Sequence, residues 1–179
     1  GQGYVQVVCG APNVRAGLLV AWLPPGSTVP ASYDKDRFVL DARELKDICY
    51  FIPCPKSPHG CDVDPTGEYI VGSGKLAALI PVFSFDKMQK AIADKAFAGD
   101  YDGIPVIKYE AALYGEVKKP GLGPLHTEFD GKGNAYTSFF VSSEVVKWNI
   151  KDLKVVDRVP TFYSVGHLCV PGGDSKKPF

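Results

Sequence analysis

"LHTEFDGKGNAYTSFFVSSEVVKWNIKDL", residues Leu125–Leu153, is the stretch that decides the fold of this chain. It opens with a histidine, passes through an Asp-Gly turn at Asp130–Gly133, and continues into two runs rich in β-branched and aromatic residues. Asp at the start of such a turn bonds the nearby backbone, and Gly accepts positive φ at no steric cost. The stretch therefore predicts short antiparallel strands joined by tight turns.

The same pattern occurs once more, earlier in the chain. His59 is followed five residues later by a Gly-bearing turn at Asp64–Gly67, within the stretch "PHGCDVDPTGEYIVGSGKLAALIPVFSFDKM" that begins at Pro58. A third histidine, His167, follows His126 by 41 residues, and repeats of roughly 40–45 residues are typical of β-propeller blades. We therefore expect an all-β fold: a partial β-propeller of about three adjacent blades.

The first of these blades carries an insertion. His59 and His126 are 67 residues apart, too far for one blade of ordinary length. Between them, "FDKMQKAIADKAF" has apolar residues at helical spacing, which predicts one short surface helix near Asp86–Phe97. Asp86 is the expected N-cap of that helix.

Composition excludes several classes of partner. The 179 residues suffice for one well-buried domain, and 20 basic residues balance 20 acidic ones without a basic run, so we expect no nucleic-acid partner. No apolar stretch has the length of a membrane span. The chain begins inside a strand-like run, so residues 1–179 are expected to be an internal fragment of a longer protein.

The five cysteines form no C-x-x-C pair, and we expect them to be small buried residues rather than a disulfide framework or a zinc knuckle.

The three histidines are candidate metal ligands. Equivalent positions on the innermost strands of a propeller form a ring around its central channel, so His59, His126 and His167 should each begin such a strand and point toward one region. Neutral imidazoles suit copper or zinc, and the spacing does not choose between these metals. The Gly- and Pro-rich flanks restrict the backbone before each ring and would hold it in place.

Lys147 has two interpretations. It alternates with Trp148, which is expected to be a core residue, so the lysine lies on the opposite face of the strand. Lys147 is then either an ordinary exposed strand lysine or a cation that faces the channel.

Beyond these patterns, three long motifs closely resemble nitrous oxide reductase, in the branch whose third motif contains Gly-His-Leu. The resemblance runs from about Ile52 to the end of the chain. Its motifs are "PKSPHGCDVDPTGEYIVGSGKL", "GLGPLHTEFDGKGNAYTSFFVSSEVVKWNI" and "YSVGHLCVPGGDSKKPF". The resemblance implies the N-terminal seven-bladed propeller of that family, which holds a tetranuclear copper–sulfide cluster bound by seven histidines.

Within that family, each histidine of this chain falls on a ligand motif. The resemblance thus implies that His59, His126 and His167 are copper ligands, and that Lys147 matches a lysine beside the cluster which helps with protons or charge. A calcium site in the family draws on upstream residues and on the position of Ser57. Asp36 is the best match among the upstream ones, and calcium binding is left open.

The resemblance also implies a reaction and its partners. Nitrous oxide is reduced by two electrons to dinitrogen and water. The electrons come from a small donor protein such as a cytochrome c or a cupredoxin, through a binuclear copper in a C-terminal cupredoxin domain that this fragment lacks. The family works as a head-to-tail homodimer in the periplasm. The fragment alone is not expected to be active.

Two other functions compete with this one. A non-catalytic propeller could serve as a binding or scaffold module, with the histidines as ordinary turn residues. A propeller hydrolase with one divalent metal would need carboxylate ligands at repeat-equivalent positions, and none accompany the histidines in that way. Convergence of the imidazoles on one region would favour the copper protein, and scattered rings would favour the scaffold.

Overall fold

Antiparallel strands dominate the computed structural model, which describes residues 31–34, 37–40, 43 and 48–171. The elements, in chain order, are β1 (Ala31–Asp34), β2 (Arg37–Leu40), β3 (Pro58–Val63), β4 (Tyr69–Gly74), β5 (Leu79–Ser84), α1 (Phe85–Ala93), β6 (Phe97–Tyr101), β7 (Ile104–Ile107), α2 (Tyr109–Ala112), β8 (Leu113–Lys118), β9 (Pro124–Phe129), β10 (Asn134–Phe139), β11 (Glu144–Asn149) and β12 (Lys154–Pro160). None of the helices in these ranges is long and apolar enough to span a membrane.

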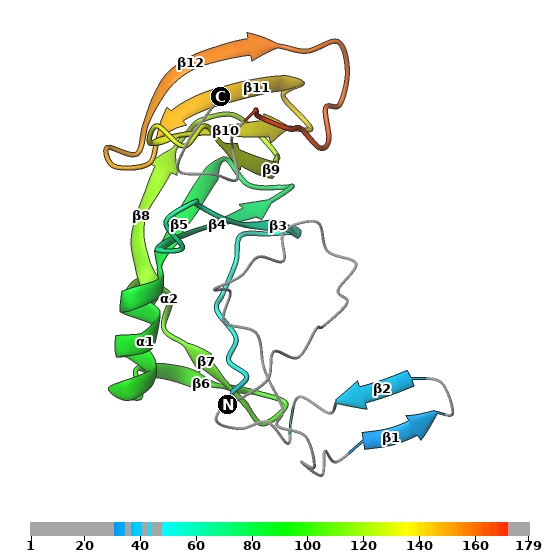
Figure 1. Ribbon diagram of the computed structural model, residues 1–179, viewed down its shortest axis with the longest axis vertical. Helices are drawn as coiled ribbons and strands as arrows, with labels where there is room; N and C mark the ends of the chain where they lie inside the picture. The colour runs from blue at the N-terminus through cyan, green and yellow to red at the C-terminus, as the bar shows by residue number, and fades with distance from the viewer. Residues whose placement is uncertain (1–30, 35–36, 41–42, 44–47, 172–179) are drawn as a thin grey trace, which may run out of the picture.

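Two four-stranded sheets form the body of the molecule. Blade A has the order β3-β4-β5-β8, and blade B has the order β9-β10-β11-β12. Every pairing within them is antiparallel, and the two sheets lie one above the other (Figure 1). Consecutive four-stranded antiparallel sheets are the units of a propeller, so the prediction of a partial β-propeller is confirmed. The described ranges hold these two blades and two further strand pairs, β1–β2 and β6–β7.

The predicted Asp turns connect the first two strands of each blade. In blade A, the Asp64 carboxylate accepts hydrogen bonds from the backbone N–H groups of Thr66 (3.2 Å) and Tyr69 (2.9 Å). In blade B, Asp130 accepts from the N–H groups of Lys132 (2.8 Å) and Asn134 (3.1 Å). These bonds replace ladder bonds where the chain reverses, which is why Asp begins both turns.

An apolar core fills the space between the two blades. Val71 and Val82 of blade A and Phe139 and Trp148 of blade B are all fully buried in one cluster. The Trp148 indole N–H donates to the Thr137 hydroxyl (2.9 Å), which shares a further hydrogen bond with the Thr127 hydroxyl (2.8 Å). The polar groups of these three side chains are therefore paired with one another, whereas the buried Ser73 hydroxyl on β4 has no partner among the described residues.

We expect Trp148→Phe to lower the free energy of unfolding by about 1–3 kcal/mol, because it leaves a small cavity and removes the donor to the Thr137 hydroxyl. Urea denaturation of the purified chain measures the loss. Val156→Ala is the control, since Val156 lies on β12 with 57% of its surface exposed and should change the stability little. Equal stabilities for the two variants would contradict the role of Trp148 in the core.

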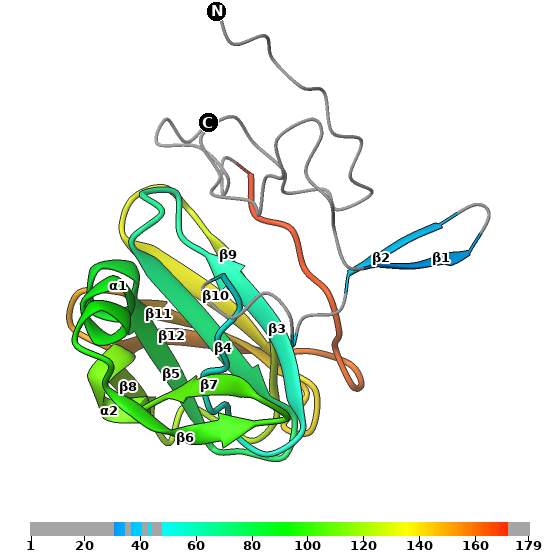
Figure 2. The same cartoon turned by 90° about the horizontal axis from the view of Figure 1, so that it is seen from below.

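The insertion lies between β5 and β8 and covers the other face of blade A. It contains α1, the β6–β7 pair and α2 (Figure 2). Its apolar residues pack with Phe83 in a second cluster. The helix was predicted, but two of its limits differ. Ser84 rather than Asp86 is the N-cap, because the Ser84 hydroxyl accepts from the Lys87 N–H (3.1 Å). The helix ends at Ala93, and Lys95 then takes a positive φ of 52° before β6 begins.

Candidate metal centre

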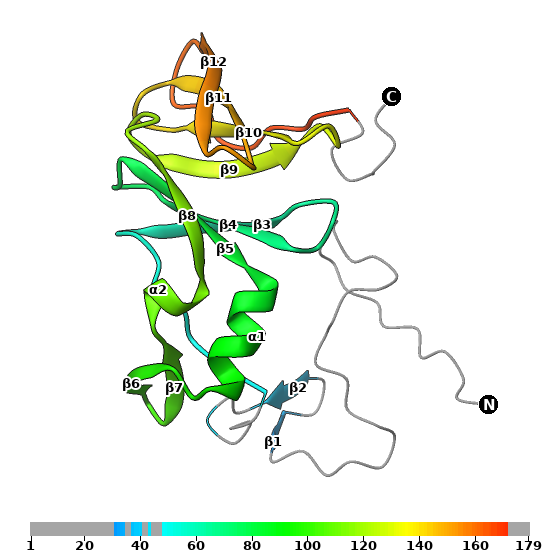
Figure 3. The same ribbon diagram turned by 90° about the vertical axis from the view of Figure 1, so that its left-hand side faces the viewer.

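The junction of the two blades brings the histidines together. β3 and β9 are the first strands of their blades and lie side by side, as Figures 2 and 3 show from two directions. His59 is the second residue of β3, and His126 is the third residue of β9. His167 comes from the segment that follows β12, where the described residues form no strand. Three separate segments thus supply the cluster, and within the described residues His59 and His126 lie on the first strands of blades A and B.

The three imidazoles share one region without stacking. The ring centroids of His126 and His167 are 5.0 Å apart with the planes tilted by 59°, and those of His59 and His167 are 6.3 Å apart with a tilt of 56°. His59 and His167 are exposed, whereas the His126 side chain is only 19% exposed. Over the described part of the chain, no group of three or more histidine, cysteine or carboxylate side chains is placed to hold a metal ion as it stands.

Both nitrogens of His126 face a polar partner. Its Nδ1 accepts a hydrogen bond from the Leu168 N–H at 3.1 Å, which ties the ring to the residue after His167. Its Nε2 lies 3.8 Å from Asp62 Oδ1 and 3.6 Å from Glu128 Oε1. A neutral imidazole whose Nδ1 accepts must carry its proton on Nε2, so this proton points toward the two carboxylates.

Asp62 is the carboxylate that joins the blades here. Its Oδ2 accepts from the Thr127 N–H at 2.8 Å, a bond between residues 65 positions apart in sequence. The side chain is 12% exposed. Burial raises the pKa of Asp62 above its ordinary value, and the Thr127 bond and the three nearby histidines oppose that rise. No local sequence pattern singles out Asp62, because only the packing of β3 against β9 brings it to His126.

Lys147 lies on the histidine face of blade B. It pairs with Tyr136 across β10, and Tyr136 in turn pairs with Glu128 on β9. Its Nζ is 5.5 Å from the centroid of the Tyr136 ring, within the range of a cation–π contact. Trp148 points to the opposite face, so the predicted alternation is confirmed. A row of side chains on one face therefore leads from Lys147 to the strand that carries His126.

The charge of Lys147 also acts on Asp130, in the turn of blade B. Burial alone would raise the pKa of Asp130, but hydrogen bonds from Asn134 and Lys132, together with the positive charge of Lys147, hold this pKa below its ordinary value. The Tyr136 hydroxyl approaches the same carboxylate at 3.5 Å. Lys147 is thus part of a polar cluster on its face of the blade.

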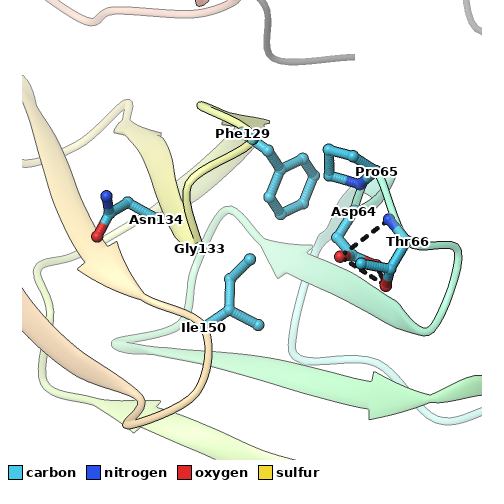
Figure 4. A pocket seen from close by; sticks show the side chains of 8 residues that line it. Asp64, Pro65, Thr66, Phe129, Gly133, Asn134 and Ile150 are labelled. Atoms are coloured by element: carbon cyan, nitrogen blue, oxygen red, sulfur yellow. Dashed lines mark hydrogen bonds between the residues drawn. The ribbon is translucent and has the colours of Figure 1, made fainter. Parts of the chain in front are cut away.

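A shallow groove between the two Asp turns is separate from the histidines. It is lined by Asp64, Pro65, Thr66, Phe129, Gly131, Gly133, Asn134 and Ile150. Figure 4 shows the Asp64 carboxylate bonded to Thr66 rather than directed into open space. The turn itself uses these polar atoms, so we assign the groove no catalytic role.

The expectation that the cysteines are buried is wrong for those that the structure describes. The cysteines are not generally buried: Cys54, Cys61 and Cys169 are exposed, because they lie on the edge strand β3 and on connecting segments, and Cys49 is half-buried. Cys9 lies outside the described residues.

For the calcium site, Ser57 has a positive φ of 60° just before β3, and Asp36 lies outside the described residues.

Fold and site together define a class: a partial β-propeller that gathers histidines where the first strands of adjacent blades meet. No family model matches the chain. The nitrous-oxide reductase of Stutzerimonas stutzeri is 37% identical to it over 144 residues, 73% of this chain and 21% of that protein. The nitrous-oxide reductase of Pseudomonas fluorescens is 37% identical over 143 residues, 78% of this chain and 19% of that protein. The chain is therefore homologous to nitrous-oxide reductases, as its motifs predicted, and it spans about a fifth of their length.

Other similarities are shorter or more distant. The phenylalanine–tRNA ligase beta subunit of Rhodopseudomonas palustris is 61% identical over 31 residues, which are 17% of this chain and 4% of that protein. Among solved structures, Kuenenia stuttgartiensis hydrazine synthase superposes with a TM-score of 0.44 and 11% identity, over 60% of this chain and 24% of that one. Neither similarity contributes to the assignment of function.

Proposed function

We propose that this chain is the part of a nitrous-oxide reductase propeller that supplies three ligands to a copper cluster, where nitrous oxide is reduced to dinitrogen and water. The observation that carries the proposal is the convergence of His59, His126 and His167, the only histidines of the chain, from three separate segments. This convergence occurs in a chain that is 37% identical to nitrous-oxide reductases over 73% of its length.

The donor set fits copper. Imidazole nitrogens are ligands that copper accepts, and rings 5.0 and 6.3 Å apart suit ligands of different atoms in one multinuclear cluster. When bound, the cluster would supply the electrons for the reduction. The residues present hold the rings in place, and a metal bound at His126 Nδ1 would replace the Leu168 N–H there while the Nε2 proton stays directed at Asp62 and Glu128.

The rest of the proposal concerns the whole protein. Residues 1–179 belong to its N-terminal propeller, and the other cluster ligands and the cupredoxin domain with the binuclear copper lie outside this chain. We infer a periplasmic head-to-tail homodimer that takes electrons from a small donor such as a cytochrome c or a cupredoxin. Calcium remains a candidate second metal through Ser57.

Anaerobic loading with Cu(I) tests the ligand assignment. The purified chain should retain copper after desalting, measured by elemental analysis, while the complete gene product should consume nitrous oxide with a reduced dye as electron donor. A folded chain that retains no copper would overturn the assignment and favour the alternative of a non-catalytic propeller that serves as a binding or scaffold module.

We expect Lys147→Met in the complete enzyme to slow nitrous oxide turnover by about 10- to 100-fold while copper content is retained, because the reduction consumes protons and the positive charge is removed near the cluster. Nitrous oxide consumption and copper content are measured side by side. Lys154→Met on the exposed edge strand β12 is the matched control. Turnover equal to that control at every pH would make Lys147 an ordinary exposed strand lysine.

A further inference from the structure

Asp62 contacts both elements that position the histidines. It lies on β3, three residues after His59, and its carboxylate reaches across the junction to β9 beside His126. We propose that Asp62 is a positioning residue that holds the histidine-bearing strands of the two blades together and orients His126 for the metal. This inference rests on the proposed copper function for its consequence, but its structural part can be tested without metal.

The first step is the bond between the blades. Asp62 Oδ2 accepts the Thr127 N–H at 2.8 Å, and a hydrogen bond to a charged acceptor is stronger than one between neutral groups. Thr127 follows His126 directly, so this bond fixes the backbone on which the His126 ring is carried. Asp62 lies near the end of β3, and the same strand carries His59 near its start. The bond therefore sets the distance between two of the three ligands.

A second step orients the ring itself. Asp62 Oδ1 lies 3.8 Å from His126 Nε2, on the opposite side of the ring from the Leu168 N–H that donates to Nδ1. A donor on one nitrogen and an anion beside the other favour one tautomer and one ring orientation. Because Leu168 is bonded to the same ring, this orientation also restrains the neighbouring His167.

Glu128 is the second carboxylate beside His126, and it is placed differently from Asp62. Its Oε1 is 3.6 Å from His126 Nε2, but it lies on the same strand as His126 and its side chain is 29% exposed, against 12% for Asp62. Both carboxylates place negative charge beside the ring, and Asp62 in addition accepts the Thr127 N–H from the other blade. The less exposed carboxylate is also less screened by solvent.

Two substitutions separate the bond from the charge. Asp62→Asn keeps an oxygen that can accept the Thr127 N–H but removes the charge, and Asp62→Ala removes both. Asp157→Asn, on the exposed strand β12, is the control for loss of an acidic charge. Cu(I) affinity of the purified chain is measured by competition with a chromophoric Cu(I) chelator. Hydrogen exchange of the Thr127 amide and the ¹⁵N shifts of the His126 ring are measured by NMR without metal.

We expect Asp62→Asn to weaken Cu(I) binding by about 10-fold and Asp62→Ala by about 10- to 100-fold, the usual cost of removing an outer-shell partner of a metal ligand. Only Asp62→Ala should expose the Thr127 amide to rapid exchange, and both should shift the His126 ring nitrogens toward a mixture of tautomers. An Asp62→Ala chain whose Thr127 exchange and His126 shifts match those of Asp157→Asn would overturn the inference. Failure of the unmodified chain to bind copper would instead refute the proposed function, and the metal-free NMR result would still decide the role of Asp62.

Discussion

Replacing His59, His126 and His167 together with alanine should weaken Cu(I) binding to this chain by more than about 100-fold, because removal of a single outer-shell partner already costs about 10- to 100-fold at metal sites. The three rings are the only imidazoles of the chain, and they lie in one region with ring centroids 5.0 and 6.3 Å apart. Competition with a chromophoric Cu(I) chelator measures the affinity, and circular dichroism checks that the fold is retained.

Cysteine variants provide the control for this experiment. Cys54, Cys61 and Cys169 are exposed free thiols, and thiolates bind Cu(I) strongly, so they are the obvious competing ligands. A chain with all three changed to serine should keep the affinity of the unmodified chain. The copper assignment fails if affinity follows the cysteines rather than the histidines. Single histidine variants then show whether the less exposed His126 contributes more than the exposed His59.

The parts of the fold that could be predicted from the sequence depend on local chemistry. Asp64 and Asp130 begin turns because their carboxylates bond the backbone N–H groups that follow them, and that requirement is visible in a few consecutive residues. Lys147 and Trp148 fall on opposite faces because side chains alternate along any strand. The family resemblance then gave the histidines a chemical role that the spacing alone could not choose.

What the sequence could not show are contacts between distant segments. Asp62 meets Thr127 across 65 positions, and Leu168 meets His126 across 42, so neither pair follows from a local pattern. The N-cap of α1 was missed for a different reason. Ser84 and Asp86 are both good capping residues two positions apart, and the strand that precedes the helix decides which of them stands at its start.

A second large effect is expected at the junction of the two blades, where Gly60 of β3 lies against β9. We expect Gly60→Ala to lower the free energy of unfolding by about 3 kcal/mol or more, adding the cost of a left-handed residue to that of forcing an extra methyl group into packed structure. Gly60 has a φ of +76°, and a Cβ placed there would lie 2.3 Å from the Leu125 carbonyl oxygen and 3.3 Å from Asp62 Oδ2. The nearest of these atoms is backbone of β9, so the strain can be relieved only by moving the two blades apart.

Gly67→Ala separates the two causes. Gly67 has nearly the same φ, +81°, but a Cβ there meets no atom within 4 Å, so only the backbone cost of about 1–2 kcal/mol should remain. Urea denaturation of both variants gives the difference. Because β3 carries His59 and β9 carries His126, separation of the strands by Gly60→Ala should also weaken Cu(I) binding, whereas Gly67→Ala should leave it unchanged. If the two variants are equally stable and bind Cu(I) equally well, the close approach of β3 and β9 is not what positions the histidines.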